Sequence, residues 1–309
     1  TNNIDGNSLN NIINTAIIDN GTVNVNGGSI TGSNATGNSI KNILGNFDAG
    51  GYANITSSDV TIQGGTISGQ GANNNTITNA IDPIFAGPGY LDIYGGSISG
   101  NGNNNNTNSN SFVGNVNTGT VDMGQGSISG VGAFTDNITN SINGDVTTTG
   151  DVTIGSDTLS TTNGYDNHLS NVINGDILNA DNVTLGGSEL SGSNNGSSGA
   201  NTLSNTVGNV NAQGNVTLAG NGISGNNNVN NTLSNTIAGN ESTFGDLTVG
   251  GSSIGANGSP VTGNNNNILT NTINGTASAD NVALGGDNIW GNSNSSNHFT
   301  NAINSTVTA

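Results

Sequence analysis

The sequence predicts an all-β protein built as a single β-solenoid (β-helix). Three observations predict it: an apolar pattern that returns about every 31 residues, apolar spacings of two inside each repeat, and Gly, Asn and Asp at the joints. Repeats of about 20 to 50 residues are typical of solenoids, and a spacing of two is the period of a strand. We expect one repeat domain over residues 1–309, with about ten circuits of three short strands each.

The first strand of each repeat is predicted by the pattern apolar-x-Asn-x-apolar, as in LSNTV at 203–207 and LSNTI at 233–237. It occurs in ten copies, of which one departs with Phe112, Gly114 and Val116 at the three positions. Because the Asn shares a strand face with its apolar neighbours, we expect an inward stack of hydrogen-bonded amides. A corner position facing water is the alternative. The expected stack contains Asn11, Asn42, Asn79, Asn140, Asn171, Asn205, Asn235, Asn271 and Asn301.

The other two strands are predicted by an apolar-x-apolar cluster and by a single apolar residue five positions later. Val216, Leu218 and Ile223 are one example, and the residues between them are usually rich in Gly and Ser. Gly, Asn and Asp tolerate the positive φ angles that tight joints need. Variation in repeat length falls between the clusters, so insertions are expected at corners.

The composition fits a solenoid better than a globular core or a flexible linker. Only 30% of the residues are hydrophobic, which is below the usual share of about 45–50%. A solenoid circuit buries its inward residues against the circuits above and below it, so it needs fewer of them. Main-chain hydrogen bonds and rows of identical side chains about 4.8 Å apart are expected to supply the remaining stability.

The charge excludes two classes of partner. With 19 acidic residues against one Lys and a net charge of −18, the chain repels nucleic acid and anionic lipid surfaces. It lacks a run of about 20 apolar residues, so no membrane span is expected.

The absence of cysteine excludes a disulfide framework. The chain begins at Thr1 without a Met or a signal-like core, which favours a processed or secreted form.

Residues for catalysis are scattered. Hydrolysis or elimination needs a paired acid and base or a cation, and the chain offers His168, His298 and Lys41 with isolated carboxylates. The two histidines are 130 positions apart, about four circuits, so they cannot act together. We expect no enzymatic activity and no cofactor.

An acidic patch and a single tryptophan are the two candidate surface features. Asp59, Asp92 and Asp122 form a candidate acidic patch near two tyrosines, which could hold Ca²⁺ or a sugar, although Ca²⁺ needs about six to eight oxygen ligands. Trp290 replaces a small residue after the third apolar position, where it would cover an end or touch a neighbour.

A row of outward hydroxyls is also expected between the two apolar residues of the second cluster. Such a row could order water as ice-binding proteins do, but Asn24, Asp92, Asp122 and Ala283 interrupt it. Its members are Thr61, Thr153, Thr184, Thr217 and Thr248.

The phrases GNVTL at 214–218 and GDVTI at 150–154, followed by Gly-rich turns, resemble the β-helical stalks of filamentous-haemagglutinin-type adhesins and autotransporter passengers. The Asn stack and the repeats without visible caps resemble curlin-like secreted functional amyloids, although those carry inward Gln. The resemblance implies a secreted or cell-surface fibre of bacteria, used for matrix, biofilm or attachment.

These features lead to ranked expectations of function. The first is a structural subunit that polymerises with itself, head to tail, because open solenoid edges are unpaired. The alternative is an ice- or polysaccharide-binding module, with a surface polysaccharide as its partner. A carbohydrate-active enzyme ranks last for lack of a cationic group.

Overall fold

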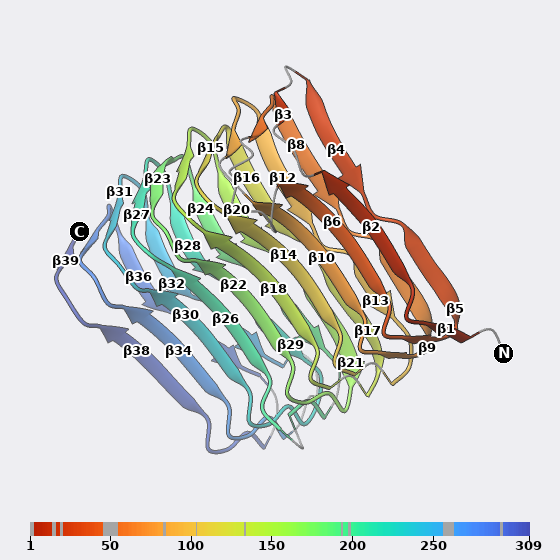
Figure 1. Ribbon diagram of the computed structural model, residues 1–309. Coiled ribbons are helices and arrows are strands. Elements are labelled where there is room, and N and C mark those ends of the chain that lie inside the picture. The colour runs from red at the N-terminus through yellow and green to blue at the C-terminus, as the bar shows by residue number, and fades with distance from the viewer. Residues whose placement is uncertain are drawn as a thin grey trace.

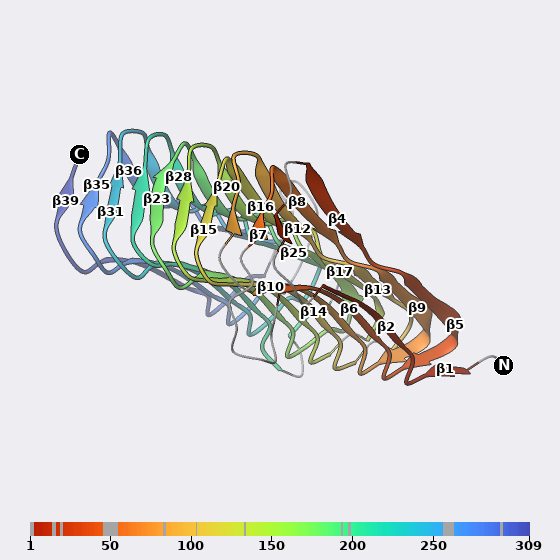
Figure 2. The same ribbon diagram turned by 45° about the horizontal axis from the view of Figure 1, so that its top comes forward.

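The computed structural model describes residues 3–13, 17–18, 21–45, 55–82, 85–102, 104–132, 134–192, 194–196, 199–255, 263–290 and 293–309. These residues form strands and turns, wound into a β-solenoid that runs from β1 at one end to β39 at the other (Figures 1 and 2). Each circuit adds one strand to each of four parallel sheets. The described strands make nine complete circuits and three strands of a tenth.

Sheets A and B contain the third and the first apolar clusters of the repeat. Sheet A consists of β1 (Asn3–Asp5), β5 (Ser29–Thr36), β9 (Thr66–Asn73), β13 (Ser97–Ser99), β17 (Ser127–Val131), β21 (Thr158–Thr162), β25 (Glu189–Ser191), β29 (Gly222–Ser224), β33 (Ser253–Ile254) and β37 (Asn288–Ile289). Sheet B consists of β2 (Ser8–Ile13), β6 (Ser39–Gly45), β10 (Thr76–Asp82), β14 (Thr107–Val113), β18 (Asn137–Asn143), β22 (His168–Ile173), β26 (Thr202–Val207), β30 (Thr232–Ile237), β34 (Ile268–Ile273) and β38 (His298–Ile303).

Sheet D contains the second cluster, and sheet C lies between B and D along the chain. Sheet C consists of β3 (Ile17–Ile18), β7 (Ile55–Thr56), β11 (Phe85–Ala86), β15 (Val116–Thr118), β19 (Val146–Thr148), β23 (Ile177–Ala180), β27 (Val210–Ala212), β31 (Glu241–Thr243), β35 (Ala277–Ser278) and β39 (Val307–Thr308). Sheet D consists of β4 (Thr22–Asn26), β8 (Asp59–Gln63), β12 (Tyr90–Tyr94), β16 (Thr120–Gly124), β20 (Val152–Gly155), β24 (Val183–Gly186), β28 (Val216–Ala219), β32 (Leu247–Gly250) and β36 (Val282–Gly285).

The expected all-β solenoid is confirmed, but the number of strands in a circuit is four rather than three. The strands of sheet C are only two to four residues long. Most of them begin with an inward apolar residue, such as Val146 or Ile177, and have no second large apolar residue two positions later. A spacing of two therefore cannot be recognised in them. The fourth strand was therefore missed.

The alignment expected for the copy with Phe112, Gly114 and Val116 is also wrong. In the structure Asn79, Asn110 and Asn140 are partners on adjacent strands, so Asn110 and not Gly114 occupies the Asn position. Phe112 follows as the second apolar residue, and Val116 belongs to sheet C. The irregular residue in this copy is Asn108, which replaces the first apolar residue and is buried.

The interior contains two apolar columns. One joins sheets C and D with the second apolar residue of sheet B, as at Leu185, Ile177 and Ile173. The other joins sheet A with the first apolar residue of sheet B, as at Leu190 and Leu169. The Asn column of sheet B lies between these two apolar residues on every strand except β14, where Asn108 replaces the first of them, so it separates the columns.

In several circuits glycine is required where the chain passes from sheet D to sheet A. Gly155 has a φ of +133°, and a Cβ atom on it would lie 1.9 Å from the carbonyl oxygen of Gly186 in the next circuit. Residues that carry a Cβ atom rarely adopt this backbone conformation. The Gly-rich joints therefore allow circuits to stack closely.

Candidate functional site

A continuous ladder of asparagine amides runs along the interior of the solenoid. The Nδ2 of each member donates to Oδ1 of the next at 2.7–2.9 Å, from Asn11 through to Asn301. The inward stack is thereby confirmed, with Asn110 as an additional member. Asn11 and Asn301 lie exposed at the two edges, whereas the members between them are buried.

The ladder also ties sheet B to the opposite wall. Several of the Nδ2 groups donate a second bond across the interior, for example Asn42 to the carbonyl of Gln63 at 3.1 Å and Asn79 to that of Tyr94 at 2.9 Å. An amide has two donors and an acceptor, so both directions can be satisfied inside the protein. The ladder therefore holds circuits together and fixes the width of the interior.

A second ladder follows the corner that precedes sheet B. In most circuits one amide oxygen accepts both the backbone N–H and the Nδ2 of the preceding member, as Asn75 does from Asn38 at 3.0 and 3.1 Å. Sequence reasoning missed it, although the residue two positions before the first cluster is Asn in every copy but one. The members are Asn7, Asn38, Asn75, Asn106, Asp136, Asn167, Asn201, Asn231, Asn267 and Asn297.

Both ladders have the same direction, because the earlier residue donates and the later one accepts. Among the described residues, Asn11 donates but accepts no bond on its Oδ1, at the edge formed by β2. Asn301 accepts from Asn271 at 2.9 Å, and its Nδ2 donates no bond to any residue that the structure describes, at the edge formed by β38. One edge of the solenoid thus offers amide acceptors and the other offers amide donors.

The candidate acidic patch lies on the outer face of sheet D. Asp92 and Asp122 are direct partners on β12 and β16, and the Tyr94 hydroxyl donates to Asp122 Oδ2 at 3.3 Å. Asp59 is outside their column, because Thr61 of the same strand is the partner of Asp92. Its Oδ1 instead accepts the backbone N–H of Tyr90 at 3.1 Å. Two carboxylates are therefore adjacent and the third is offset.

Burial raises the pKa of both carboxyl groups of this pair, and the charge of Asp122 raises that of Asp92 further. Burial, followed by the charge of Asp122 and then that of Asp59, raises the pKa of Asp92 to about 6, against the hydrogen bond from Tyr94. Burial also raises the pKa of Asp122, and burial with the two nearby anions raises the pKa of the Tyr94 hydroxyl. Among the described residues no group of three or more His, Cys, Asp or Glu could hold a metal ion.

Three other carboxyl groups are buried within the stack: Asp136, Asp157 and Glu241. Burial raises the pKa of each to about 7, and hydrogen bonds offset this only in part. Asp157 accepts bonds from Gly126 N–H at 2.8 Å and Asn140 Nδ2 at 2.6 Å. By contrast, Oδ2 of Asp136 and both oxygens of Glu241 have no hydrogen-bond partner among the residues that the structure describes.

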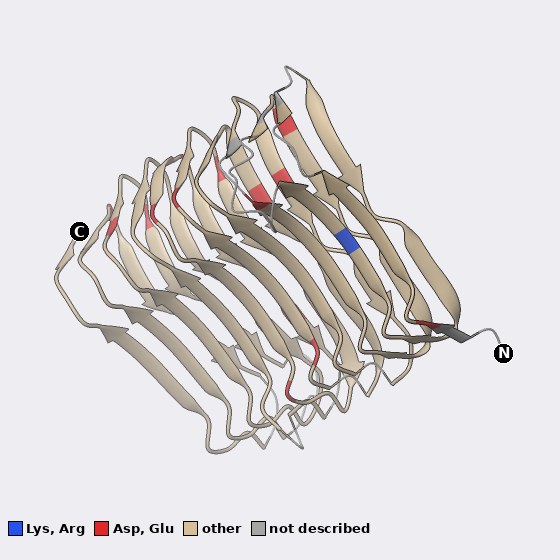
Figure 3. Cartoon of the chain, in the orientation of Figure 1, with Lys and Arg blue, Asp and Glu red and all other residues tan. Residues whose placement is uncertain are grey.

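Charged groups are distributed unevenly over the outside. Figure 3 shows acidic residues mainly at the corners and on sheet D, and the single basic segment is Lys41 on β6 of sheet B. His168 and His298 are exposed in one outward column of sheet B, four strands apart. Four strand spacings correspond to about 19 Å. The structure does not bring the two histidines together.

The outward Thr row of sheet D is also in register. The column contains Thr153, Thr184, Thr217 and Thr248 on consecutive strands, after Asp92 and Asp122 and before Ala283. The interruptions expected from the sequence therefore fall in the same column as the threonines.

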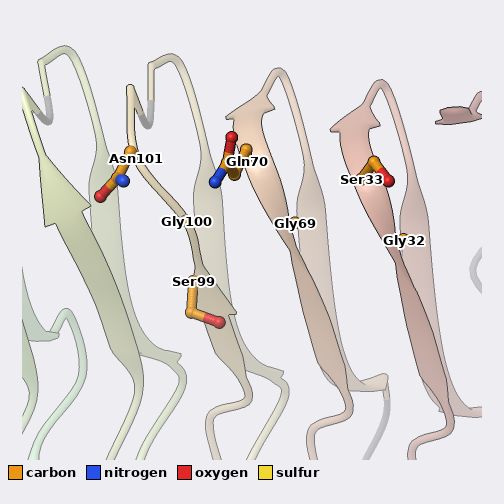
Figure 4. A pocket seen from close by; sticks show the side chains of 7 residues that line it. All are labelled: Gly32, Ser33, Gly69, Gln70, Ser99, Gly100 and Asn101. Atoms are coloured by element: carbon orange, nitrogen blue, oxygen red, sulfur yellow. The ribbon is translucent and has the colours of Figure 1, made fainter. Parts of the chain in front are cut away.

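A shallow groove of about 640 Å³ crosses sheet A near its N-terminal end. Figure 4 shows Gly32, Gly69 and Gly100 in a row on successive circuits, with Ser33, Gln70 and Asn101 on one side of the row and Ser99 on the other. The lining contains no ionisable and no aromatic residue. A second groove, lined partly by Trp290, lies over sheet A at the other end.

In the part of the chain that the structure describes, no helix has the length and apolar character needed to cross a membrane. Comparison with protein-family models, with curated proteins and with solved structures finds no match to this chain.

Proposed function

We propose that the chain is a structural subunit of an extracellular filament, or of a matrix or adhesion fibre, in which copies stack head to tail through open solenoid edges. The observation that carries the proposal is the shared direction of the two ladders. An edge with amide donors complements an edge with amide acceptors, whereas two like edges do not complement each other. A contact of this kind is heterologous and continues into a filament when it does not close.

Apolar residues at the two edges support the same contact. Leu9 and Ile13 of β2 are 37% and 36% exposed, and Phe299 and Ile303 of β38 are 46% and 40% exposed. They occupy the two apolar columns of sheet B whose other members are mostly buried. Stacking β2 of one copy on β38 of another would continue both columns and bury all four side chains. The extracellular placement is supported by the resemblance to bacterial surface fibres.

Negative-stain electron microscopy of the purified chain over a range of concentrations tests the proposal. We expect unbranched filaments with an axial repeat of about 48 Å, from ten strand spacings. Phe299→Lys should abolish them, because it places a charge in the contact. Phe244→Lys is the matched control, since Phe244 is 72% exposed on a corner outside both edges. Monomers at every concentration, or filaments from Phe299→Lys, would refute the proposal.

A second candidate is ice binding by the outer face of sheet B. One hydroxyl column runs unbroken over eight strands, and neighbouring hydroxyls approach each other, as Ser170 and Ser204 do at 3.3 Å. It is longer than the Thr row of sheet D, and strands β14 to β38 of this face carry no acidic residue. The column contains Thr78, Ser109, Thr139, Ser170, Ser204, Ser234, Thr270 and Thr300.

Thermal hysteresis measurements distinguish this candidate from the fibre. Ser204→Tyr should remove hysteresis, because a bulky ring breaks the flat column. Thr217→Tyr on sheet D is the control and should leave it unchanged. Absence of hysteresis in the unmodified chain would eliminate ice binding.

A further inference from the structure

The groove at the C-terminal end of sheet A combines an aromatic ring, a carboxylate and hydroxyls around a glycine floor. It spans β25, β29 and β33 and reaches the residue after β37, has a volume of about 410 Å³, and is lined by Trp290, Glu189, Ser224 and Ser253 among others. The volume lies in the range of small-ligand sites, which is about 300–1,000 Å³. Trp290 is the only tryptophan of the chain.

The hollow exists because side chains are missing where other circuits have them. Ser127, Thr158 and Glu189 precede Gly222 in one outward column of sheet A, and Ser253 follows it. A Cβ on Gly222 would meet only Ser253 Oγ at 3.8 Å and Glu189 Cγ at 4.0 Å, both ordinary contacts. Packing of the fold therefore does not require glycine here, and its effect is to leave space between the two neighbours.

The ends of the hollow are held in place. Ser224 Oγ donates to Glu189 Oε1 at 2.8 Å, which orients the carboxylate and leaves its other oxygen available as an acceptor. At the other end the backbone N–H of Trp290 donates to the carbonyl of Ile254 at 2.8 Å. Gly255, between Ser224 and Trp290 in the repeat, has a φ of +84°, which favours glycine and keeps that position free of a side chain.

We propose that this groove binds a neutral polysaccharide, with a sugar ring packed on Trp290 and sugar hydroxyls bound by Glu189 and Ser253. An indole ring offers a flat apolar face to the C–H face of a sugar. A carboxylate and serine hydroxyls supply the acceptors and donors that sugar hydroxyls need. Glu189 is the only ionisable residue of the lining, and with a net charge of −18 it disfavours anionic polysaccharides. The site goes beyond fibre formation and does not depend on it.

The only tryptophan of the chain provides the assay. The folded protein is titrated with cellohexaose, with maltohexaose and with hexagalacturonate while Trp290 fluorescence is recorded. We expect a saturable change with at least one neutral oligosaccharide and none with the uronate at the same concentrations. No saturable change with either neutral oligosaccharide, or equal binding of the uronate, would overturn the proposal.

Two variants locate the binding. Gly222→Thr fills the hollow with a residue that sheet A already carries in this column, and should weaken binding by about tenfold or more. Ser127→Thr makes the same kind of change in the same column outside the groove, and should leave affinity unchanged. Trp290→Ala, followed by calorimetry, should lose binding with circular dichroism unchanged. Binding that survives both Gly222→Thr and Trp290→Ala would place the site elsewhere and overturn the assignment.

Discussion

Asn106 directs its backbone amide and its side-chain amide at one oxygen of Asp136, at 2.8 and 3.0 Å. The other members of this corner ladder are asparagines, most of which donate to the next member through Nδ2, but Oδ2 of Asp136 has no hydrogen-bond partner in the described part of the chain. A protonated carboxyl carries an O–H that can replace the amide donor. The backbone N–H of Asp136 donates to Asn167 Oδ1 at 3.0 Å in either state, but only neutral Asp136 has a side-chain donor with which to continue the corner ladder.

The solenoid should be more stable in mild acid than above neutrality. The pKa of Asp136 is raised from 3.8 to about 7 by burial, so the folded state binds a proton that the unfolded state releases. The contribution of this proton uptake to the free energy of unfolding is complete below about pH 4 and is lost as the pH rises through 7. Asp157 and Glu241 shift in the same direction. Urea unfolding should give a midpoint that falls between pH 4 and pH 8, and a midpoint that rises would contradict this.

Asp136→Asn should remove part of this pH dependence. The amide restores the donor at every pH, so the variant should gain about 2–4 kcal/mol over the unmodified chain at pH 8 and little at pH 4. Asp145→Asn is the control, because Asp145 is exposed and lies on another corner. Urea unfolding at the two pH values measures both variants, and an equal gain at both pH values would show that protonation is not the cause.

Glu241→Val should stabilise the solenoid most at high pH. Glu241 is 2% exposed, and its neighbours in the same inward column are Val210 and Ala277. Within the described ranges its two oxygens have no hydrogen-bond partner. The amide of Ser278 supports the anion in part, without a hydrogen bond of normal geometry. The column otherwise contains apolar residues, so Val fits it. A gain in unfolding free energy that is larger at pH 8 than at pH 5 is expected, and destabilisation at pH 8 would contradict the account.

The repeat could be predicted from the sequence because each circuit places the same residue type at the same inward position. Asn205 and Asn235 recur with the same apolar neighbours, and a hydrogen bond of 2.7 Å joins them. The strands of sheet C escaped prediction because they are too short to show a spacing of two. Asn110 was misassigned because Asn108 replaces the apolar residue that marks the start of its copy.

The surface sites were less accessible to sequence reasoning. The repeat places Asp92 opposite Asp122, as their shared position predicts, but it sets Asp59 outside that column. The groove beside Trp290 depends on a missing side chain at Gly222 and on contacts across four circuits. Because Gly is so frequent in this chain, Gly222 by itself does not predict a groove. The missing side chain can be recognised only when neighbouring circuits are aligned.

Interrupting the central ladder should cost far more than removing an exposed amide. Asn205→Ala removes the acceptor of Asn171 and the donor to Asn235, and leaves both buried without that partner. Each unsatisfied group costs about 1–3 kcal/mol, so the variant should lose about 2–5 kcal/mol. Asn211→Ala, at an exposed position of sheet C, should change stability by less than about 0.5 kcal/mol. Chemical unfolding gives both values, and similar losses would contradict a stabilising ladder.

Removing one charge of the acidic pair should make its partner a stronger acid. Asp122→Asn takes away the repulsion that, after burial, contributes most to the raised pKa of Asp92. The pKa of Asp92 should then fall below about 6 but stay above its ordinary value, because burial remains. Carboxyl carbon chemical shifts followed against pH measure it. An unchanged or higher pKa would show that the two carboxylates do not interact.

Two glycine substitutions separate close stacking from backbone conformation alone. Gly155 and Gly132 both have positive φ, +133° and +71°. A Cβ on Gly155 would lie 1.9 Å from the oxygen of Gly186, whereas a Cβ on Gly132 would have no described atom within 4 Å apart from its own chain neighbours. Gly132→Ala should therefore cost only the conformational penalty of about 1–2 kcal/mol. Gly155→Ala should cost more than about 3 kcal/mol, since circuits must move apart. Thermal and urea unfolding compare them, and equal losses would mean that the joint between sheets D and A is not closely packed.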